Sequence, residues 1–252
     1  MLLAVDIGNS NIVFGLWGQK KWILTERFET RPIDGSFYRA KFNHPLKKHS
    51  IPPDHVTEII IGSVVPEVNE SLLDVLNDLF SPRPVFLNSS IDTGLHISNE
   101  HTGQIGADLI AGSVAAYHLA QDNCIVVDFG TATTVMAVQK PGILAGGAIC
   151  AGLKASKEAL IGQAAQLYDI ELKPPPSVLG KNTIETMQSG LVVGHIAMVE
   201  GLIKRFKKEL GPCKVVATGG FVKLLTPLTE TFDFVEPHLT LNGMRLIVEK
   251  NK

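Results

Sequence analysis

The sequence predicts an α/β protein made of two similar lobes, because one strand pattern occurs twice. Residues 2–17 (LLAVDIGNSNIVFGLW) have the pattern of a buried strand, an Asp-x-Gly turn and a second strand. Residues 123–138 (NCIVVDFGTATTVMAV) repeat that order about half a chain later, and a third strand follows in both places. We therefore expect residues 1–118 and 119–252 to form two lobes, each with a sheet flanked by helices.

In the first half, apolar runs predict strands at residues 2–5, 12–17, 22–28 and 58–66, with a short one at 85–87. Helices are expected at 38–48 and 67–80, the second from apolar residues at helical spacing. A further helix should follow Asp108. Its expected apolar face consists of Ile110, Val114, Ala115 and His118.

In the second half, strands flank Asp128 and a third strand is expected at 142–149. A helix should cover 153–167, and the proline-containing segment 172–178 should be a stiff connector. A long amphipathic helix is expected from Thr183 to Leu210. A strand at 214–217 then leads to Thr218-Gly219-Gly220.

Composition and charge exclude several classes of partner. The net charge of −2 indicates no preference for nucleic acid or anionic membranes, and the basic residues at 204–208 are explained as a solvated helix end. The N-terminus does not resemble a signal peptide, and no continuous apolar run approaches ~18 residues. The three cysteines form no C-x-x-C pair and suit buried thiols. We expect a soluble, cytoplasmic protein.

The loop that begins at Asp6 has the side chains that phosphate handling requires. Gly8 would let backbone amides approach a phosphate, while Asn9, Ser10 and Asn11 offer side-chain donors. Asp6, at the end of its strand, could bind Mg²⁺. The alternative is a plain polar hairpin turn, since Asn-Ser-Asn is also good turn chemistry.

A second loop with Asp128, Thr131, Thr133 and Thr134 strengthens the phosphate interpretation. Two facing Asp-x-Gly turns could hold a nucleoside triphosphate between the lobes. The glycines that follow Thr218 would allow the backbone to pack against an adenosine. Gly-Gly between a strand and a helix is common, so this pair indicates a nucleotide site only in combination with the other motifs.

Asp108 has two interpretations. It could be a helix cap or first-turn acid at the start of its helix. It could instead be a carboxylate that accepts a proton from a substrate hydroxyl. The local sequence favours the cap.

The order of these motifs closely resembles the type III pantothenate kinases over nearly the whole chain. The motifs are DIGNS at 6–10, GAD at 106–108, DFGTATT at 128–134, GGAI at 146–149, GKNTIETMQSG at 180–190 and ATGG at 217–220. The resemblance implies an actin-like fold (two ribonuclease H-like lobes with mixed sheets flanked by helices), usually as a homodimer. It also implies phosphorylation of pantothenate with ATP, Mg²⁺ and a monovalent cation, K⁺ or NH₄⁺, in coenzyme A biosynthesis.

The resemblance also implies roles for individual residues. Asp128 would bind the monovalent cation, Asp6 the Mg²⁺, and Asp108 would be the catalytic base. ATP would be bound by Asp6, Ile7, Gly8, Asn9, Ser10, Asn11, Ile12, Val13, Thr131 and Gly219. Pantothenate would be bound by Gly106, Ala107, Asp108, Leu109 and Thr183.

Several acceptor-side positions depart from the family pattern. Leu109 stands where the family has Arg, and Ala151 replaces a usual Pro. A usual Tyr falls near Asn99 or Glu100, and a usual Pro near Thr102. An arginine pairs strongly with a carboxylate and leucine offers no donor, although Lys154 is a candidate substitute.

Three functions therefore remain open. The first is a pantothenate kinase with an altered acceptor site. The second is a nucleotide-binding paralogue that has lost turnover and serves a regulatory or accessory role. The third is a kinase for another small hydroxylated acceptor. The presence of Asp108 and Thr183 favours an active enzyme.

Overall fold

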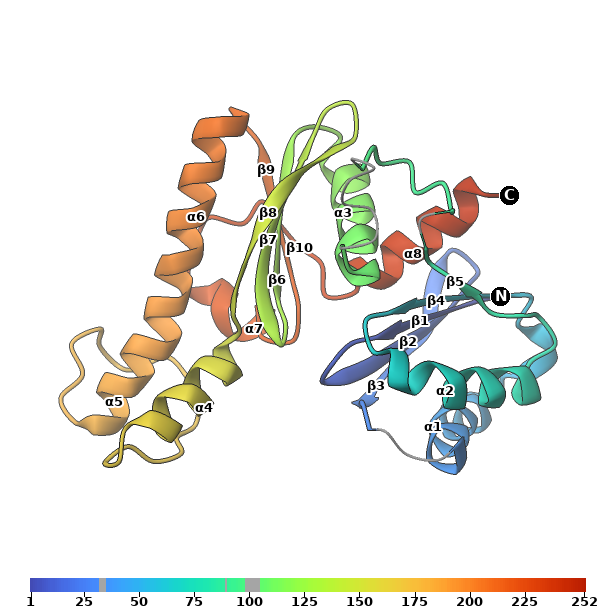
Figure 1. Ribbon diagram of the computed structural model, residues 1–252, viewed down its shortest axis with the longest axis horizontal. Helices are drawn as coiled ribbons and strands as arrows, with labels where there is room; N and C mark the ends of the chain where they lie inside the picture. The colour runs from blue at the N-terminus through green and yellow to red at the C-terminus, as the bar shows by residue number, and fades with distance from the viewer. Residues whose placement is uncertain (32–34, 89, 98–104) are drawn as a thin grey trace. The chain divides into compact units, whose positions relative to one another are not determined.

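The computed structural model describes residues 1–31, 35–88, 90–97 and 105–252, which form two compact units (Figure 1). Unit 1 comprises Met1–Ala115 and Leu239–Lys252, and unit 2 comprises Ala116–His238. The expected departures from the family at Asn99, Glu100 and Thr102 lie outside the described residues.

Unit 1 contains a five-stranded mixed sheet, with strand order β3-β2-β1-β4-β5. β1–β2 and β2–β3 are antiparallel pairs, and β4 and β5 join in parallel. The strands are β1 (Leu2–Ile7), β2 (Asn11–Gly18), β3 (Lys21–Glu29), β4 (Glu58–Ser63) and β5 (Val85–Phe86). The helices of the first half are α1 (Gly35–Lys48), η1 (Pro53–His55), α2 (Pro66–Leu79) and α3 (Ala107–Ala120).

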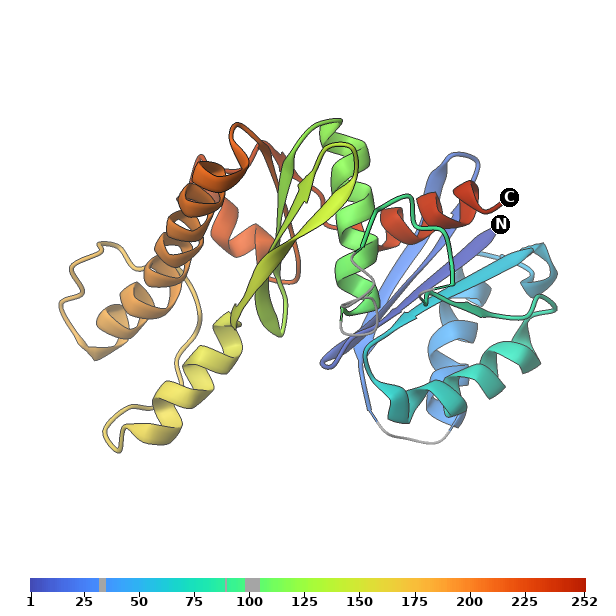
Figure 2. The same ribbon diagram turned by 45° about the horizontal axis from the view of Figure 1, so that its top comes forward.

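Alternate residues of β1 serve two separate cores. Leu3, Val5 and Ile7 are fully buried in a cluster with side chains of α1 and α2. Leu2 and Ala4 point to the opposite face and pack with side chains of α3 and α8 (Leu239–Lys250). Figure 2 shows α8 on the face of this sheet opposite to α1 and α2. A strand with both faces covered explains the unbroken apolar run of β1.

The C-terminal helix α8 makes the unit boundary differ from the expected division at residue 119. Leu241, Met244 and Ile247 of α8 are buried against the first sheet. The helix approaches α3 so closely that a Cβ on Gly243 would lie 1.7 Å from the carbonyl oxygen of Ala111. Residues 239–252 therefore group with unit 1, because their apolar face covers a sheet face that would otherwise be open to water.

Unit 2 repeats the topology of unit 1. Its sheet has the order β8-β7-β6-β9-β10, with antiparallel and parallel pairs in the same places. Its strands are β6 (Cys124–Phe129), β7 (Ala132–Gln139), β8 (Ile143–Ala151), β9 (Lys214–Thr218) and β10 (Phe234–Val235). Asp6 and Asp128 occupy the same position of β1 and β6, which have the same burial pattern. The expected duplicated α/β fold is confirmed.

The helices of unit 2 are α4 (Leu153–Gln163), α5 (Thr183–Gln188), α6 (Gly194–Leu210) and α7 (Val222–Leu225), with 3₁₀ turn η3 at Thr226–Leu228. A π-helical turn, η2 (Ser189–Val193), joins α5 and α6 into one run from Thr183 to Leu210. By length and composition alone that run could cross a membrane. Val192, Ile196 and Val199 are instead buried in the core of unit 2, which accounts for its apolar character.

Three local expectations need correction. The helix expected at 153–167 ends at Gln163, after Gly162, a residue that weakens helices. His118 does not belong to the apolar face of α3: it is exposed, because the buried part of that helix ends at Ala116. Of the three cysteines only Cys124 is buried, where desolvation raises its pKa to about 12; the other two are half-buried.

Candidate active site

The first Asp-x-Gly loop is a tight turn bonded to Thr30, the residue that follows β3. The amide of Gly8 donates to the carbonyl of Asn11 at 3.0 Å, which closes the turn. The Thr30 hydroxyl donates to the Gly8 carbonyl at 2.6 Å, and the Thr30 amide donates to Ser10 at 3.1 Å. Residues 8–11 therefore form the polar hairpin turn that the sequence allowed. It leaves the side chains of Asn9 and Ser10 exposed and able to meet a ligand.

The residues that flank this loop face in different directions. Ile7 and Ile12 are fully buried in the core beneath α1 and α2. Only their main-chain atoms could therefore face a nucleotide. Asp6 lies on the opposite face of β1, in register with Val13 on β2 and Gly62 on β4. Asp6 and Val13 are both half-buried.

Asp108 lies near the same end of the strands as Asp6, the carboxyl end of β1 and β4. It is the second residue of α3, and the first, Ala107, packs in the cluster that covers the Asp6 face of β1 and β4. A Cβ on Gly106 would lie 3.1 Å from a methyl carbon of Val64, the residue just after β4. Asp6 and Asp108 thus both lie near the carboxyl ends of β1 and β4, where open α/β sheets bind their ligands.

The carboxylate of Asp108 is held against the beginning of its own helix. Its Oδ1 accepts a hydrogen bond of 2.8 Å from the amide of Leu109. Gly106 leaves it room, because a Cβ there would lie 2.4 Å from Oδ1. Desolvation raises the pKa of Asp108, although main-chain hydrogen bonds act in the opposite direction. A carboxylate with a raised pKa is a better proton acceptor, which suits a general base.

Leu109 follows directly and is half-buried. It belongs to none of the three hydrophobic clusters formed by the described residues. A polar replacement at this position would therefore not disrupt a core.

In unit 2, Asp128 lies between two threonines in the sheet. It is in register with Thr134 on β7 and with Thr218 on β9, so the three side chains share one face. The Thr134 hydroxyl is buried and has no hydrogen-bond partner among the described residues. Gly219 has a φ of +102°, and a Cβ there would lie 2.4 Å from the Asp128 carboxylate. Glycine at 219 therefore keeps the space beside Asp128 open.

Thr131 lies at the tip of the loop between β6 and β7. The Gly130 amide donates to the Ala132 carbonyl at 3.1 Å, which closes this turn as the corresponding bond closes the turn in unit 1. Thr131 is exposed. Its side chain is thus placed like those of Asn9 and Ser10.

Two contributions to this site were not predicted. Thr218 joins Asp128 only through strand register. His195 on α6 contacts the Thr133 hydroxyl through its Nε2, at 2.8 Å. Asp-x-Gly and its threonines mark the loop in the sequence, whereas His195 appears there only as one polar residue within an amphipathic helix.

Thr183 lies at a helix start in unit 2. The preceding Asn182 caps α5, because its Oδ1 accepts from the Glu185 amide at 3.0 Å, and Glu185 in turn accepts from the Lys181 amide at 2.9 Å. Thr183 borders a groove of about 590 Å³ between α4 and the α5–η2 segment. The other lining residues are mostly apolar or small: Ser156, Leu160, Leu167, Thr186, Met187, Gly190 and Leu191.

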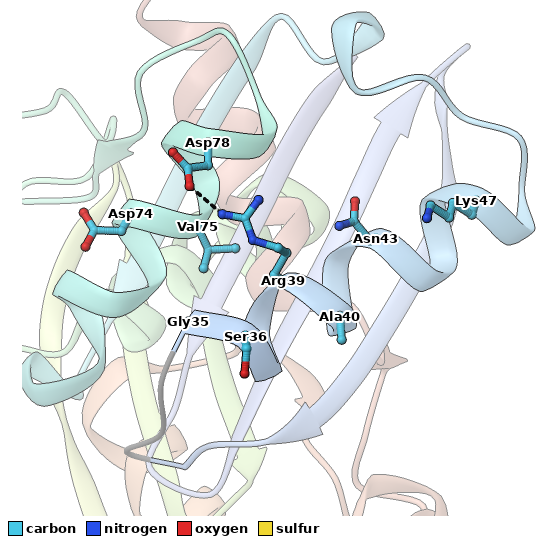
Figure 3. Close-up of a pocket in the computed structure, with 9 residues that line it drawn as sticks. All are labelled: Gly35, Ser36, Arg39, Ala40, Asn43, Lys47, Asp74, Val75 and Asp78. Atoms are coloured by element: carbon cyan, nitrogen blue, oxygen red, sulfur yellow. Dashed lines mark hydrogen bonds and ion pairs between the residues drawn. The ribbon is translucent and has the colours of Figure 1, made fainter.

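A second groove, of about 570 Å³, lies between α1 and α2 in unit 1 (Figure 3). Arg39 on α1 forms an ion pair with Asp78 on α2, and Val75 beside the pair also lines the groove. Both charged side chains are largely exposed, so the pair contributes little to stability. None of the predicted site residues lines this groove.

Comparison with known proteins identifies the family. Residues 2–205 match the family model described as type III pantothenate kinase. The chain belongs to the type III pantothenate kinase family. Two relatives named type III pantothenate kinase match it over its full length: one from Exiguobacterium sp. at 39% identity, covering 100% of that protein, and one from Myxococcus xanthus at 40% identity, covering 99%. Members of this family are kinases, so the loops described above belong to a phosphotransferase.

Solved structures support the actin-like fold expected of a type III pantothenate kinase. The (R)-2-hydroxyglutaryl-CoA dehydratase component A of Acidaminococcus fermentans superposes with a TM-score of 0.59 at 12% identity, covering 100% of this chain and 99% of that one. The ROK hexokinase of Thermus thermophilus gives a TM-score of 0.53 at 13% identity, with the same coverage. At such identities the likeness concerns the fold alone.

Proposed function

We propose that the chain transfers the γ-phosphoryl group of ATP to pantothenate and forms 4′-phosphopantothenate, the first step of coenzyme A biosynthesis. Membership of the family over the full length supports this assignment. The observation that carries it in the structure is the position of Asp108. This carboxylate has a raised pKa and lies, like Asp6, near the carboxyl ends of β1 and β4.

In the proposed reaction the chain positions ATP and removes one proton. The turn of residues 8–11 and the turn at Thr131 bind the phosphates, with Gly219 beside the nucleotide. Gly106, Ala107, Leu109 and Thr183 contact pantothenate. Asp108 accepts the proton of the attacking hydroxyl, which needs a base within hydrogen-bond reach. Phosphoryl transfer depends otherwise on positioning and on neutralising charge.

The residues present suit the cations that the family implies. The described residues contain no cluster of three or more His, Cys, Asp or Glu side chains that could form a metal site. Oxygen donors are available instead: we assign Mg²⁺ to Asp6, and K⁺ or NH₄⁺ to Asp128 with the hydroxyls of Thr134 and Thr218. Gly219 leaves open space beside Asp128, and the Thr134 hydroxyl has no partner within the described part of the chain; both fit a ligand there. When bound, these cations would neutralise phosphate charge.

We also propose a cytoplasmic homodimer. Leu160 of α4, Ile184 of α5 and the neighbouring Leu179 are exposed apolar side chains, the last 82% exposed. They lie near the groove at Thr183 or in the loop before α5. A second copy covering this surface would remove them from water. Sedimentation of the wild type and of Leu179→Glu tests this: weaker association of the variant supports it, and a monomeric wild type contradicts it.

Leu109 favours a second candidate function, because the acceptor carboxylate lacks the usual guanidinium. Without it the chain could bind ATP but turn over pantothenate poorly, or use an acceptor without a carboxylate. Lys154 is not an evident replacement: it is exposed and pairs with Glu158 at 3.7 Å.

The deciding experiment is a coupled ADP-release assay with ATP–Mg²⁺, with and without pantothenate, with the product identified by mass spectrometry. ATP binding is measured in parallel by calorimetry. Pantothenate-dependent release, strongly reduced in Asp6→Asn, supports the kinase. ATP binding without release, at any pantothenate concentration, would refute pantothenate kinase activity and leave the paralogue or a kinase for another acceptor.

A further inference from the structure

His195 is a buried polar residue at the base of the second nucleotide loop. Only 6% of it is exposed, and its Nε2 lies 2.8 Å from the Thr133 hydroxyl. Thr133 pairs with Phe129 in the sheet, and the loop 130–132 connects these two residues. The His195 ring also contacts the Phe129 ring, with centroids 6.1 Å apart. One side chain of α6 thus touches both strands where the loop begins.

The Thr133–His195 contact joins two groups that an apolar pair could replace. Desolvation lowers the pKa of His195, so the ring is neutral near pH 7 and has one donor and one acceptor nitrogen. Leu191, Val192 and Val199, one turn away from His195 on the same helical run, are buried in the core of unit 2. Replacing both members of a buried hydrogen bond by apolar groups of similar shape can be nearly neutral for stability. The polar pair contributes a directional hydrogen bond, which fixes the orientation of the Thr133 side chain and the distance from β7 to α6.

The π-helical turn η2 sets the register that directs His195 towards the sheet. Buried residues recur every fourth position: Met187, Leu191, His195, Val199 and Ile203. In a regular α-helix this spacing drifts by about 40° per repeat, so the stripe would rotate away from the core. In η2 the Gly194 amide instead bonds to the Ser189 carbonyl, five residues back. The extra residue compensates part of the drift just before His195.

We propose that His195 is a positioning residue of the nucleotide loop, and that it holds the Thr131 turn in its ATP-binding position through Thr133. The inference rests on the proposed function, because it assumes that this loop binds ATP. Its consequence is selective. Loss of the contact should weaken ATP binding. It should leave the KM for pantothenate unchanged, because the proposed pantothenate residues lie at the beginnings of α3 and α5.

The test compares His195→Phe, His195→Gln and Thr133→Val with Val199→Ala. Phenylalanine keeps a ring against Phe129 but cannot bond to Thr133, whereas a glutamine amide can replace Nε2. Val199→Ala is the matched control, since it opens a cavity one turn further along α6 without touching the loop. Calorimetry gives the Kd of ATP–Mg²⁺, steady-state kinetics give both KM values, and a melting curve gives Tm.

We expect His195→Phe and Thr133→Val each to raise the Kd and KM for ATP by about 2- to 10-fold, the usual worth of one hydrogen bond, with KM for pantothenate unchanged. His195→Gln should recover much of the lost ATP affinity. The double variant His195→Phe/Thr133→Val should bind ATP no more weakly than either single variant. Val199→Ala should lower Tm and leave the Kd and KM for ATP unchanged. If His195→Phe does not fold, Thr133→Val and His195→Gln carry the test.

Two failures are distinguishable. A wild type that binds no ATP would refute the proposed function and this inference with it. A wild type that binds and uses ATP, with variants that change only Tm or whose effects add independently, would refute the positioning role alone.

Discussion

Replacing Asp108 by Asn separates a catalytic role from a structural one. The amide oxygen of Asn can still accept the 2.8 Å hydrogen bond from the Leu109 amide. The side chain has the same shape, so the space that Gly106 leaves remains filled. The substitution removes the negative charge and, with it, the ability of the group to take up a proton. The fold should therefore persist while the proposed base is lost.

The effect on stability follows from the raised pKa of Asp108. A group whose pKa is higher in the folded state gives its full stabilisation below the unfolded pKa, here 3.8, and loses it as pH rises through the folded value. At neutral pH the charged, partly buried carboxylate therefore lowers the free energy of unfolding. A neutral Asn avoids that cost, at the expense of a weaker hydrogen bond worth about 1 kcal/mol. For a chain of this size 1 kcal/mol corresponds to roughly 2–4 °C in Tm. We expect Tm at pH 7.5 to remain within about 4 °C of the wild type.

The effect on turnover should be much larger. A positioned acid–base group is typically worth about 10²–10⁴-fold, so kcat should fall by that factor while the Kd for ATP stays unchanged. The assay is pantothenate-dependent ADP release per folded molecule, with Asp108→Ala as a variant that also loses the hydrogen bond. A lower Tm together with normal activity per folded molecule would refute the base and leave Asp108 as a first-turn acid that stabilises α3.

Three further predictions concern single positions. The wild type should turn over faster in K⁺ or NH₄⁺ than in Na⁺ or Tris buffers, and Asp128→Asn should abolish that difference; equal wild-type rates would count against a cation at Asp128. Leu109→Arg should lower KM for pantothenate by roughly 10–100-fold with little change in kcat or in KM for ATP, because it restores a charged hydrogen bond. A lower Tm without a better KM would show that the acceptor site has been lost elsewhere. Because the pKa of His195 is lowered in the folded state, the unfolded chain binds more protons below about pH 6.5, so stability should fall as pH drops from 7.5 to 5.5. His195→Gln should reduce that acid loss, and an unchanged slope would exclude His195 as its source.

Local sequence patterns were sufficient for the parts of the fold that depend on neighbouring residues. Apolar runs bounded by polar turns predicted the two three-stranded units, and the repeated Asp-x-Gly located equivalent loops at Asp6 and Asp128. The structure has both hairpins, with the two aspartates at the same strand position. Strand and turn preferences act over a few residues, so they are legible without any knowledge of packing. The order of motifs along the chain was enough to suggest the family.

Contacts between distant parts of the chain required the tertiary structure. The sequence did not show that α8 returns to cover the first sheet, because its apolar face fits either lobe until the neighbouring surfaces are known. Thr218 joins Asp128, and His195 joins Thr133, only through strand register and the π-helical turn. The raised pKa of Asp108 likewise depends on burial. Register and desolvation are set by packing between segments tens of residues apart, and a local pattern contains no record of that packing.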